Sequence, residues 1–222
     1  IDYPHVGEVS AKGLLQKFDV DEYQSELNLL KEQSVGLSHQ SYNIDGHQWA
    51  LAIDAATQVC CFRKDLISSL PQSWNELSNL AQQNKVLWPL KPVHAISSFY
   101  SIYNNITDEF NPKDKNFINK EFGIKTLEMM KHITDHLISD CFMMDPIKTA
   151  EILSSTDDFY YSPYTYGFSN YSRENFRENI LTYGNVMDLS NKGPNGTHLG
   201  GTGIAISNKS HHKDLALEYS YW

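Results

Sequence analysis

The chain has 222 residues, of which 41% are hydrophobic and 20% charged, and its 18 Lys and Arg against 27 Asp and Glu give a formal net charge of −9. This composition is typical of a folded globular chain and is too apolar for intrinsic disorder. The negative charge, with no run of Lys and Arg longer than two, argues against a nucleic-acid partner and against binding to an anionic membrane surface.

No stretch of the sequence approaches the roughly 20 apolar residues that span a bilayer. The chain opens on Ile1 without a basic and apolar leader, so we expect any export signal to be absent or removed ahead of this numbering. Cys60, Cys61 and Cys141 are too few for a disulfide framework and lack metal-ligand spacing, and we expect them to be small buried hydrophobic residues.

Both ends of the chain carry patterns without their usual partners. Residues 1–4 are typical of the end of a strand, and residues 5–15 have apolar side chains at helical spacing. Residues 211–222 also follow a helical register, without a capping Gly or Asn. The sequence therefore predicts a fragment of a longer chain.

The next segments predict short strands and a crossing. Residues 21–33 favour a helix with an acidic start. Residues 42–49 (YNIDGHQW) predict a β-hairpin, because Asp-Gly supplies the positive φ angles of a type I′ turn. Residues 57–62 (TQVCCF) are typical of a strand in the middle of a sheet, and the small residues 54–56 before them predict a crossing point.

The middle of the chain predicts helices with recognisable starts. Ser73 and Glu76 have the spacing of a capping box, and Asp145 precedes Pro146 as a helix cap. Between and around these signals we expect a strand at 86–88, a surface loop at 108–120 and helices at 93–103, 119–139 and 146–154.

Residues 159–171 (FYYSPYTYGFSNY) differ from the rest of the chain. Seven of these thirteen residues are aromatic, and five of the seven are Tyr. A core segment would use Leu, Ile and Val, because a buried Tyr needs a partner for its hydroxyl. The composition favours the lining of a cleft that faces a polar ligand with apolar faces.

Residues 191–203 (NKGPNGTHLGGTG) are glycine-rich and predict a flexible second crossing, followed by a strand at 204–207 and the final helix. Short strands alternating with helices indicate the α/β class. The order of segments, with one crossing at residue 54 and another near residue 200, predicts two lobes.

Several motifs in this order resemble a known family. They are residues 46–54 (GHQWALAID), 62–66 (FRKDL), 71–77 (PQSWNEL), 200–207 (GGTGIAIS) and 210–216 (SHHKDLA), together with 4–8 (PHVGE) and 13–15 (GLL). In this order they resemble the bacterial extracellular solute-binding proteins of ABC transporters, family 1, carbohydrate type. Ala52, Arg63 and Ser73 depart from the family's usual Pro, Asn and Thr.

The resemblance implies a type II periplasmic-binding-protein-like fold, two lobes joined by hinge crossovers, with the first lobe incomplete in this fragment. It implies a partial first lobe at 1–54 and 203–222, a second lobe at 55–199, and hinge crossings near 52–56 and 199–203. The protein is then expected to capture a small polar solute, a sugar by this resemblance, between the lobes and deliver it to an ABC transporter permease. It is expected to be a periplasmic or extracellular monomer, lipid-anchored or free, with no cofactor.

Sugars are held by aromatic stacking and by planar polar side chains on hydroxyls. On this basis the candidate ligand-binding residues are Tyr3, His5, Asp54, His94, Tyr161, Tyr164, Tyr166, Asn170, Gly201 and Thr202. Each Tyr could instead pack on the hinge. Asp54 could cap a helix or hold the hinge, and the ligand role is favoured because an unpaired buried carboxylate is costly.

Three other functions are alternatives. A carbohydrate-active hydrolase would need two facing carboxylates, for which Asp2, Asp54, Asp157 and Asp158 are candidates. A receptor for a non-sugar solute, or an interaction domain that has lost its ligand, would keep the fold. His132 and His136 have metal-ligand spacing without an evident third ligand, so we expect a solvated helix surface and no metal.

Overall fold

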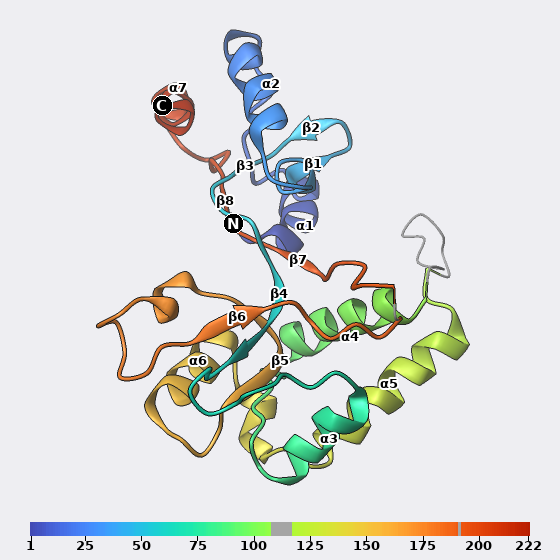
Figure 1. The fold of residues 1–222 in the computed structure, drawn as a ribbon. Helices are drawn as coiled ribbons and strands as arrows, with labels where there is room; N and C mark the ends of the chain where they lie inside the picture. Colours follow the sequence, from blue (N-terminus) through green and yellow to red (C-terminus); the bar gives the residue numbers. More distant parts are fainter. Residues whose placement is uncertain (108–116, 191) are drawn as a thin grey trace. The chain divides into compact units, whose positions relative to one another are not determined.

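The computed structural model describes residues 1–107, 117–190 and 192–222 (Figure 1). The chain divides into two compact units, Ile1–Ala56 with Leu199–Trp222 (unit 1) and Thr57–His198 (unit 2). Most of the expected surface loop, 108–116, lies outside the described residues, as does Asn191 of the glycine-rich segment.

Unit 1 is built from short elements. Its helices and 3₁₀ turns are η1 (Tyr3–His5), α1 (Val6–Ala11), η2 (Asp21–Tyr23), α2 (Gln24–Gln33), η3 (Gln40–Tyr42) and α7 (Lys213–Tyr221). Its strands are β1 (Asn43–Ile44), β2 (His47–Gln48), β3 (Leu51–Ala52), β7 (Leu199–Gly200) and β8 (Gly203–Ile204).

The predicted hairpin is confirmed. Strands β1 and β2 pair antiparallel, and the turn residues Asp45 and Gly46 have φ angles of 53° and 79°. Strand β3 pairs antiparallel with β8 from the other end of the chain, with Leu51 opposite Ile204. Two distant segments of sequence therefore form one unit.

The start of the chain differs from prediction. Asp2 forms a single bridge with Thr202 and is followed by a 3₁₀ turn. The helix expected over 5–15 covers only Val6–Ala11, because Gly13 adopts a φ of 66°, the left-handed conformation that ends helices.

Two small hydrophobic clusters fill unit 1, one of Phe18, Leu27, Leu51, Ile206 and Leu217, the other of Val6, Tyr42 and Ala50. The final helix is tied to the first cluster by Tyr221. Its ring stacks on that of Tyr23 at 4.6 Å between centroids, and its hydroxyl donates to the Phe18 carbonyl at 2.7 Å.

Unit 2 contains a sheet surrounded by helices (Figure 1). The strands are β4 (Ala56–Phe62), β5 (Tyr161–Tyr166) and β6 (Thr182–Gly184). The helices and 3₁₀ turns are α3 (Trp74–Gln82), α4 (Pro92–Ile106), α5 (Lys120–Thr134), η4 (Ser139–Met143), α6 (Pro146–Ser155) and η5 (Ser169–Ser172).

Strand β4 lies between β5 and β6 and is antiparallel to both, which confirms it as a middle strand. Strand β6 has no counterpart in the predicted elements. The strand expected at 86–88 is reduced to a single parallel bridge between Val86 and Tyr161. Its residues are nevertheless buried, and the Leu87 N–H donates to the Tyr161 carbonyl at 3.0 Å.

Helix starts in unit 2 follow the predicted caps. Ser73 Oγ accepts from the Glu76 backbone N–H at 3.2 Å, and the Glu76 carboxylate accepts from the Gln72 N–H instead of that of Ser73. Asp145 Oδ1 accepts from the Lys148 N–H at 2.9 Å. Helix α5 ends at Thr134, so the helix predicted over 119–139 is too long by residues 135–139.

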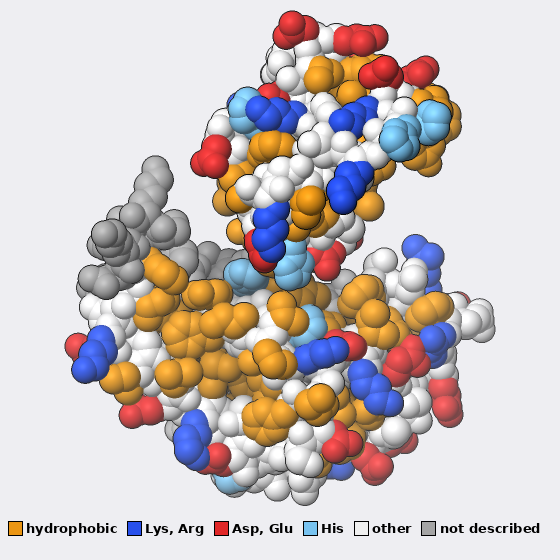
Figure 2. Space-filling model, turned by 180° about the vertical axis from the view of Figure 1, so that it is seen from behind, with side chains coloured by type: hydrophobic (Ala, Val, Ile, Leu, Met, Phe, Trp, Pro, Cys, Tyr) orange, Lys and Arg blue, Asp and Glu red, His pale blue; other side chains and the backbone are white. Residues whose placement is uncertain are grey.

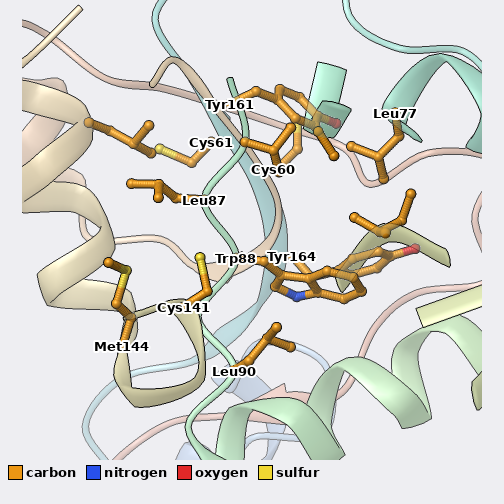
Figure 3. Packing of buried hydrophobic residues seen from close by; sticks show 14 of the residues in the cluster. Cys60, Cys61, Leu77, Leu87, Trp88, Leu90, Cys141, Met144, Tyr161 and Tyr164 are labelled. Carbon is orange, nitrogen blue, oxygen red and sulfur yellow. The ribbon is translucent and has the colours of Figure 1, made fainter. Parts of the chain in front are cut away.

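One large hydrophobic cluster forms the core of unit 2 (Figure 3). Trp88 stacks on Tyr164 with ring centroids 5.7 Å apart. Cys60, Cys61 and Cys141 are all buried in this cluster and unpaired, as predicted. Burial raises the pKa of the Cys60 thiol to about 11, so it is held as a neutral, apolar group.

Hydrophobic side chains also gather on one face of unit 2, in the lower part of Figure 2. Among the exposed hydrophobic residues of this unit are Val93, Ile96, Phe142, Met143 and Ile147. Within the described part of the chain, no helix combines the length and apolarity needed to cross a membrane.

Candidate functional site

The end of strand β5 carries a cluster of aromatic and imidazole side chains. Tyr166, the last residue of the strand, places its hydroxyl 2.9 Å from His198 Nδ1. The ring of His94 lies 6.3 Å from that of Tyr166, and the ring of Tyr100 stacks on that of His198 at 5.7 Å. We call these four residues the imidazole–phenol cluster, and all of them belong to unit 2.

A buried polar network holds His198 in place. Ser101 Oγ accepts from the His198 backbone N–H at 2.9 Å and donates to Gln58 Oε1 at 2.6 Å. Gln58 Nε2 and Trp88 Nε1 both donate to Ser98 Oγ at 3.1 Å. Since these serines and Gln58 are fully buried, the network fixes the polypeptide before the second crossing against helix α4.

Both imidazoles of the cluster favour the neutral form. Burial lowers the pKa of His94. The Asp145 carboxylate raises this pKa, and the Lys91 ammonium lowers it further. Burial also lowers the pKa of His198. Neutral imidazoles and phenols both donate and accept hydrogen bonds, as a solute hydroxyl does.

The other candidates in the tyrosine-rich segment lie in different surroundings. Tyr161 and Tyr164 are 2% and 1% exposed and pack in the core, so their side chains are not presented at the surface (Figure 3). The Tyr164 hydroxyl is buried and has no hydrogen-bond partner among the described residues. Asn170 is exposed in η5. Of the segment's four candidates, Tyr166 alone joins the cluster.

The candidates in unit 1 form a separate group around Thr202. The Thr202 backbone N–H donates to Asp54 Oδ1, and its hydroxyl donates to Asp2 Oδ1 at 3.1 Å. The Tyr3 N–H donates to the Gly201 carbonyl at 3.1 Å. Gly201 has a φ of 138°, and a Cβ there would lie 3.1 Å from the Asp54 carbonyl oxygen. These contacts fix the backbone where β3 meets the returning chain.

Asp54 is exposed, so the expectation that it is a buried carboxylate is wrong. The strand β3 ends two residues earlier, and the carboxylate accepts from a backbone N–H at the surface of unit 1. His5, also exposed, is the last residue of η1 and immediately precedes α1.

The acids proposed for a hydrolase are largely engaged in structural contacts. Asp157 pairs with the buried Arg63 guanidinium at 2.9 Å, while Asp2 and Asp54 both hold Thr202. His132 Nε2 lies 3.2 Å from Ser78 Oγ. Among the described residues, no group of three or more His, Cys, Asp and Glu is placed to hold a metal ion.

Sequence reasoning missed His198, Tyr100 and Gln58. His198 lies within the glycine-rich segment, where it is the only residue with a titratable ring, and that contrast is the signal that could have identified it. Tyr100 and Gln58 carried no such signal, because their role depends on contacts between β4, α4 and residue 198.

The fold matches solved structures over the whole chain. Maltose-bound MalE3 from T. maritima has a TM-score of 0.77 and 13% sequence identity, and the match covers 100% of this chain and 60% of the MalE3 chain. An ABC transporter solute-binding protein from Agrobacterium radiobacter K84 in complex with ribitol has a TM-score of 0.76, 19% identity and the same two coverages. The maltotriose-binding protein of Thermus thermophilus has a TM-score of 0.70, 16% identity, and covers 99% and 60%.

No protein-family model and no curated protein matches the sequence. The structural likeness shows that the chain has the α/β fold of ABC transporter solute-binding proteins, and that it spans about three-fifths of the length of the three structures.

Proposed function

We propose that the protein is an extracellular solute-binding protein that captures a small polar solute, a sugar or polyol, for an ABC transporter. The observation that carries this proposal is the match of the whole chain to the maltose-, ribitol- and maltotriose-bound structures. A binding role without catalysis accords with those three structures, each of which has a sugar or polyol bound.

The side chains of the candidate site support a solute rich in hydroxyl groups. Tyr166, His94 and His198 offer aromatic faces and neutral donors and acceptors, the combination that binds sugar rings. Unit 1 supplies a second group of polar candidates, Tyr3, His5, Asp54, Gly201 and Thr202. We propose that the residues of each group contact the solute from the unit to which they belong.

The wider biological role follows from the same proposal. The partner is the membrane permease of the transporter, the location is periplasmic or extracellular with or without a lipid anchor, and the receptor acts as a monomer.

Thermal unfolding of the protein in the presence of maltose, maltotriose or ribitol tests the proposal. A ligand that binds only the folded state at about 100 times its dissociation constant stabilises that state by about 2.7 kcal/mol and raises the melting temperature. We expect one of these solutes to raise it in wild type and in Tyr219→Phe, a control at an exposed position of α7, and to raise it less in Tyr166→Phe. The absence of a shift with every solute would contradict the proposal.

A further inference from the structure

Histidine 94 has an unusual environment for a titratable side chain. Its Nδ1 atom is buried and has no hydrogen-bond partner among the described residues. A neutral imidazole can keep its proton on Nε2 and leave Nδ1 as an acceptor, whereas an imidazolium carries an N–H at both nitrogens. Protonation would therefore bury a donor without an acceptor, which is costly.

The charged groups around His94 do not remove this cost. Asp145, at the start of α6, favours the imidazolium, but its Oδ1 already accepts from the Lys148 N–H at 2.9 Å. Lys91, just before α4, disfavours it, and from β5 the ring of Tyr166 offers no charge.

Histidine 198 shares the same hydroxyl-bearing neighbour. Its Nδ1 lies 2.9 Å from the Tyr166 hydroxyl, which is also 3.3 Å from the His198 carbonyl oxygen. A neutral ring can accept from this hydroxyl at Nδ1, but a protonated ring has to donate there, so the hydroxyl can no longer donate to the ring. The proton state of His198 thus decides whether the Tyr166 hydroxyl acts as donor or acceptor towards this imidazole. The ring of Tyr100 covers this imidazole without charge.

We propose that His94, Tyr166 and His198 bind a hydroxyl-bearing solute only while both imidazoles are neutral, so that acidification releases the solute. The inference rests on the proposed function, because it assigns a condition to the same site. Reciprocally, bound solute has to hold the imidazoles in their neutral form.

The test measures affinity for maltose, maltotriose and ribitol by calorimetry at about pH 7.5 and about pH 5.0, with the whole chain. Because a required neutral group loses up to about tenfold in occupancy for each pH unit below its pKa, we expect weaker affinity at the lower pH, by at most about tenfold for each unit by which the pKa of an imidazole exceeds the lower pH. In His94→Gln, which cannot titrate but keeps a donor and an acceptor, we expect a smaller pH dependence. His136→Gln, beyond the end of α5, is the matched control and should behave as wild type.

Nuclear magnetic resonance of the imidazole rings supplies a second readout. Added solute should lower the pKa of His94 and His198 and leave the ring signals of His136 unchanged. Equal affinity at both pH values, or a pH dependence that His94→Gln leaves intact, would overturn this inference while the proposed function stands. Failure of all three solutes at both pH values would overturn the proposed function and the inference together.

Discussion

The two units hold their chain together by different means. Unit 2 has one large hydrophobic cluster that includes residues of β4, α3, α4 and β5, whereas unit 1 has two small clusters. In unit 1, distant segments are joined by polar contacts such as the Gly203 N–H donating to the Ile1 carbonyl at 2.8 Å. Burial of a large side chain stabilises by about 1.5–3 kcal/mol, against about 1 kcal/mol for a typical hydrogen bond. Packing should therefore govern unit 2, and backbone geometry unit 1.

The largest effect is expected from Trp88→Ala in unit 2. The side chain is completely buried, stacks on Tyr164 and donates to Ser98, so its removal leaves a cavity and takes one of two donors from the Ser98 hydroxyl. We expect a loss of about 3–5 kcal/mol in the free energy of unfolding, measured by urea denaturation. Phe142→Ala, at a 48% exposed position, should change it by less than about 0.5 kcal/mol. Similar losses in the two variants would contradict a packing-governed unit.

A smaller effect is expected from Gly201→Ala in unit 1. The φ of 138° is unfavourable for alanine, and the new Cβ would approach the Asp54 carbonyl oxygen to 3.1 Å. We expect a loss of about 1–3 kcal/mol, with faster hydrogen exchange confined to unit 1. Gly7→Ala, in α1 with open space around its Cβ, should be neutral or stabilising. Faster hydrogen exchange in unit 2 would show that Gly201 does not stabilise unit 1 alone.

Asp145→Ala should cost about 1 kcal/mol in unit 2, because the substitution removes the acceptor for the Lys148 N–H at the start of α6. Asp145→Asn keeps an acceptor and should retain most of the stability. Hydrogen exchange of the first turn of α6 measures the difference. If Asp145→Asn loses as much stability as Asp145→Ala, the charge of the carboxylate matters more than its hydrogen bond to the Lys148 N–H.

The smallest effect is expected from mild acid. Burial lowers the pKa of His94 and His198 in unit 2 and of His39 in unit 1, where Lys31 acts in the same direction. The unfolded chain, with histidine pKa values near 6.5, then takes up protons first. Stability should therefore be complete above about pH 6.5 and fall below it, levelling off under the folded-state values.

This pH effect separates the units, since two of the three histidines lie in unit 2. Hydrogen exchange at about pH 7.5 and about pH 5.5, corrected for the intrinsic rates, should show the greater loss of protection there. The double variant His94→Gln with His198→Gln should reduce that difference. Equal losses in both units would contradict this distribution.

The sequence predicts best the features that neighbouring residues determine. The turn at Asp45 and Gly46 and the caps at Ser73 and Asp145 each depend on a few consecutive residues, and all are present. The helix predicted over 5–15 was too long. The apolar spacing continues past Gly13, but the helix ends at Ala11 and Gly13 adopts a left-handed conformation.

Features that depend on distant contacts were harder to predict. Ser98, Ser101 and Asn105 lie at helical spacing on α4 and would ordinarily indicate a solvated face, yet all are buried and bonded to residues 58 or 196–198. The composition of residues 159–171 identified an unusual segment. It did not distinguish Tyr164 from Tyr166, because both faces of β5 are covered along most of the strand and only its last residue reaches partial exposure.

The three buried thiols are natural probes for the opening of unit 2. All the cysteines of the chain lie in unit 2, none is paired, and burial raises the pKa of each. A thiol-reactive dye therefore meets a reactive group only when this core opens. The rate of labelling therefore measures how often the core of unit 2 opens, without any engineered cysteine. Unfolding that is restricted to unit 1 does not change this rate.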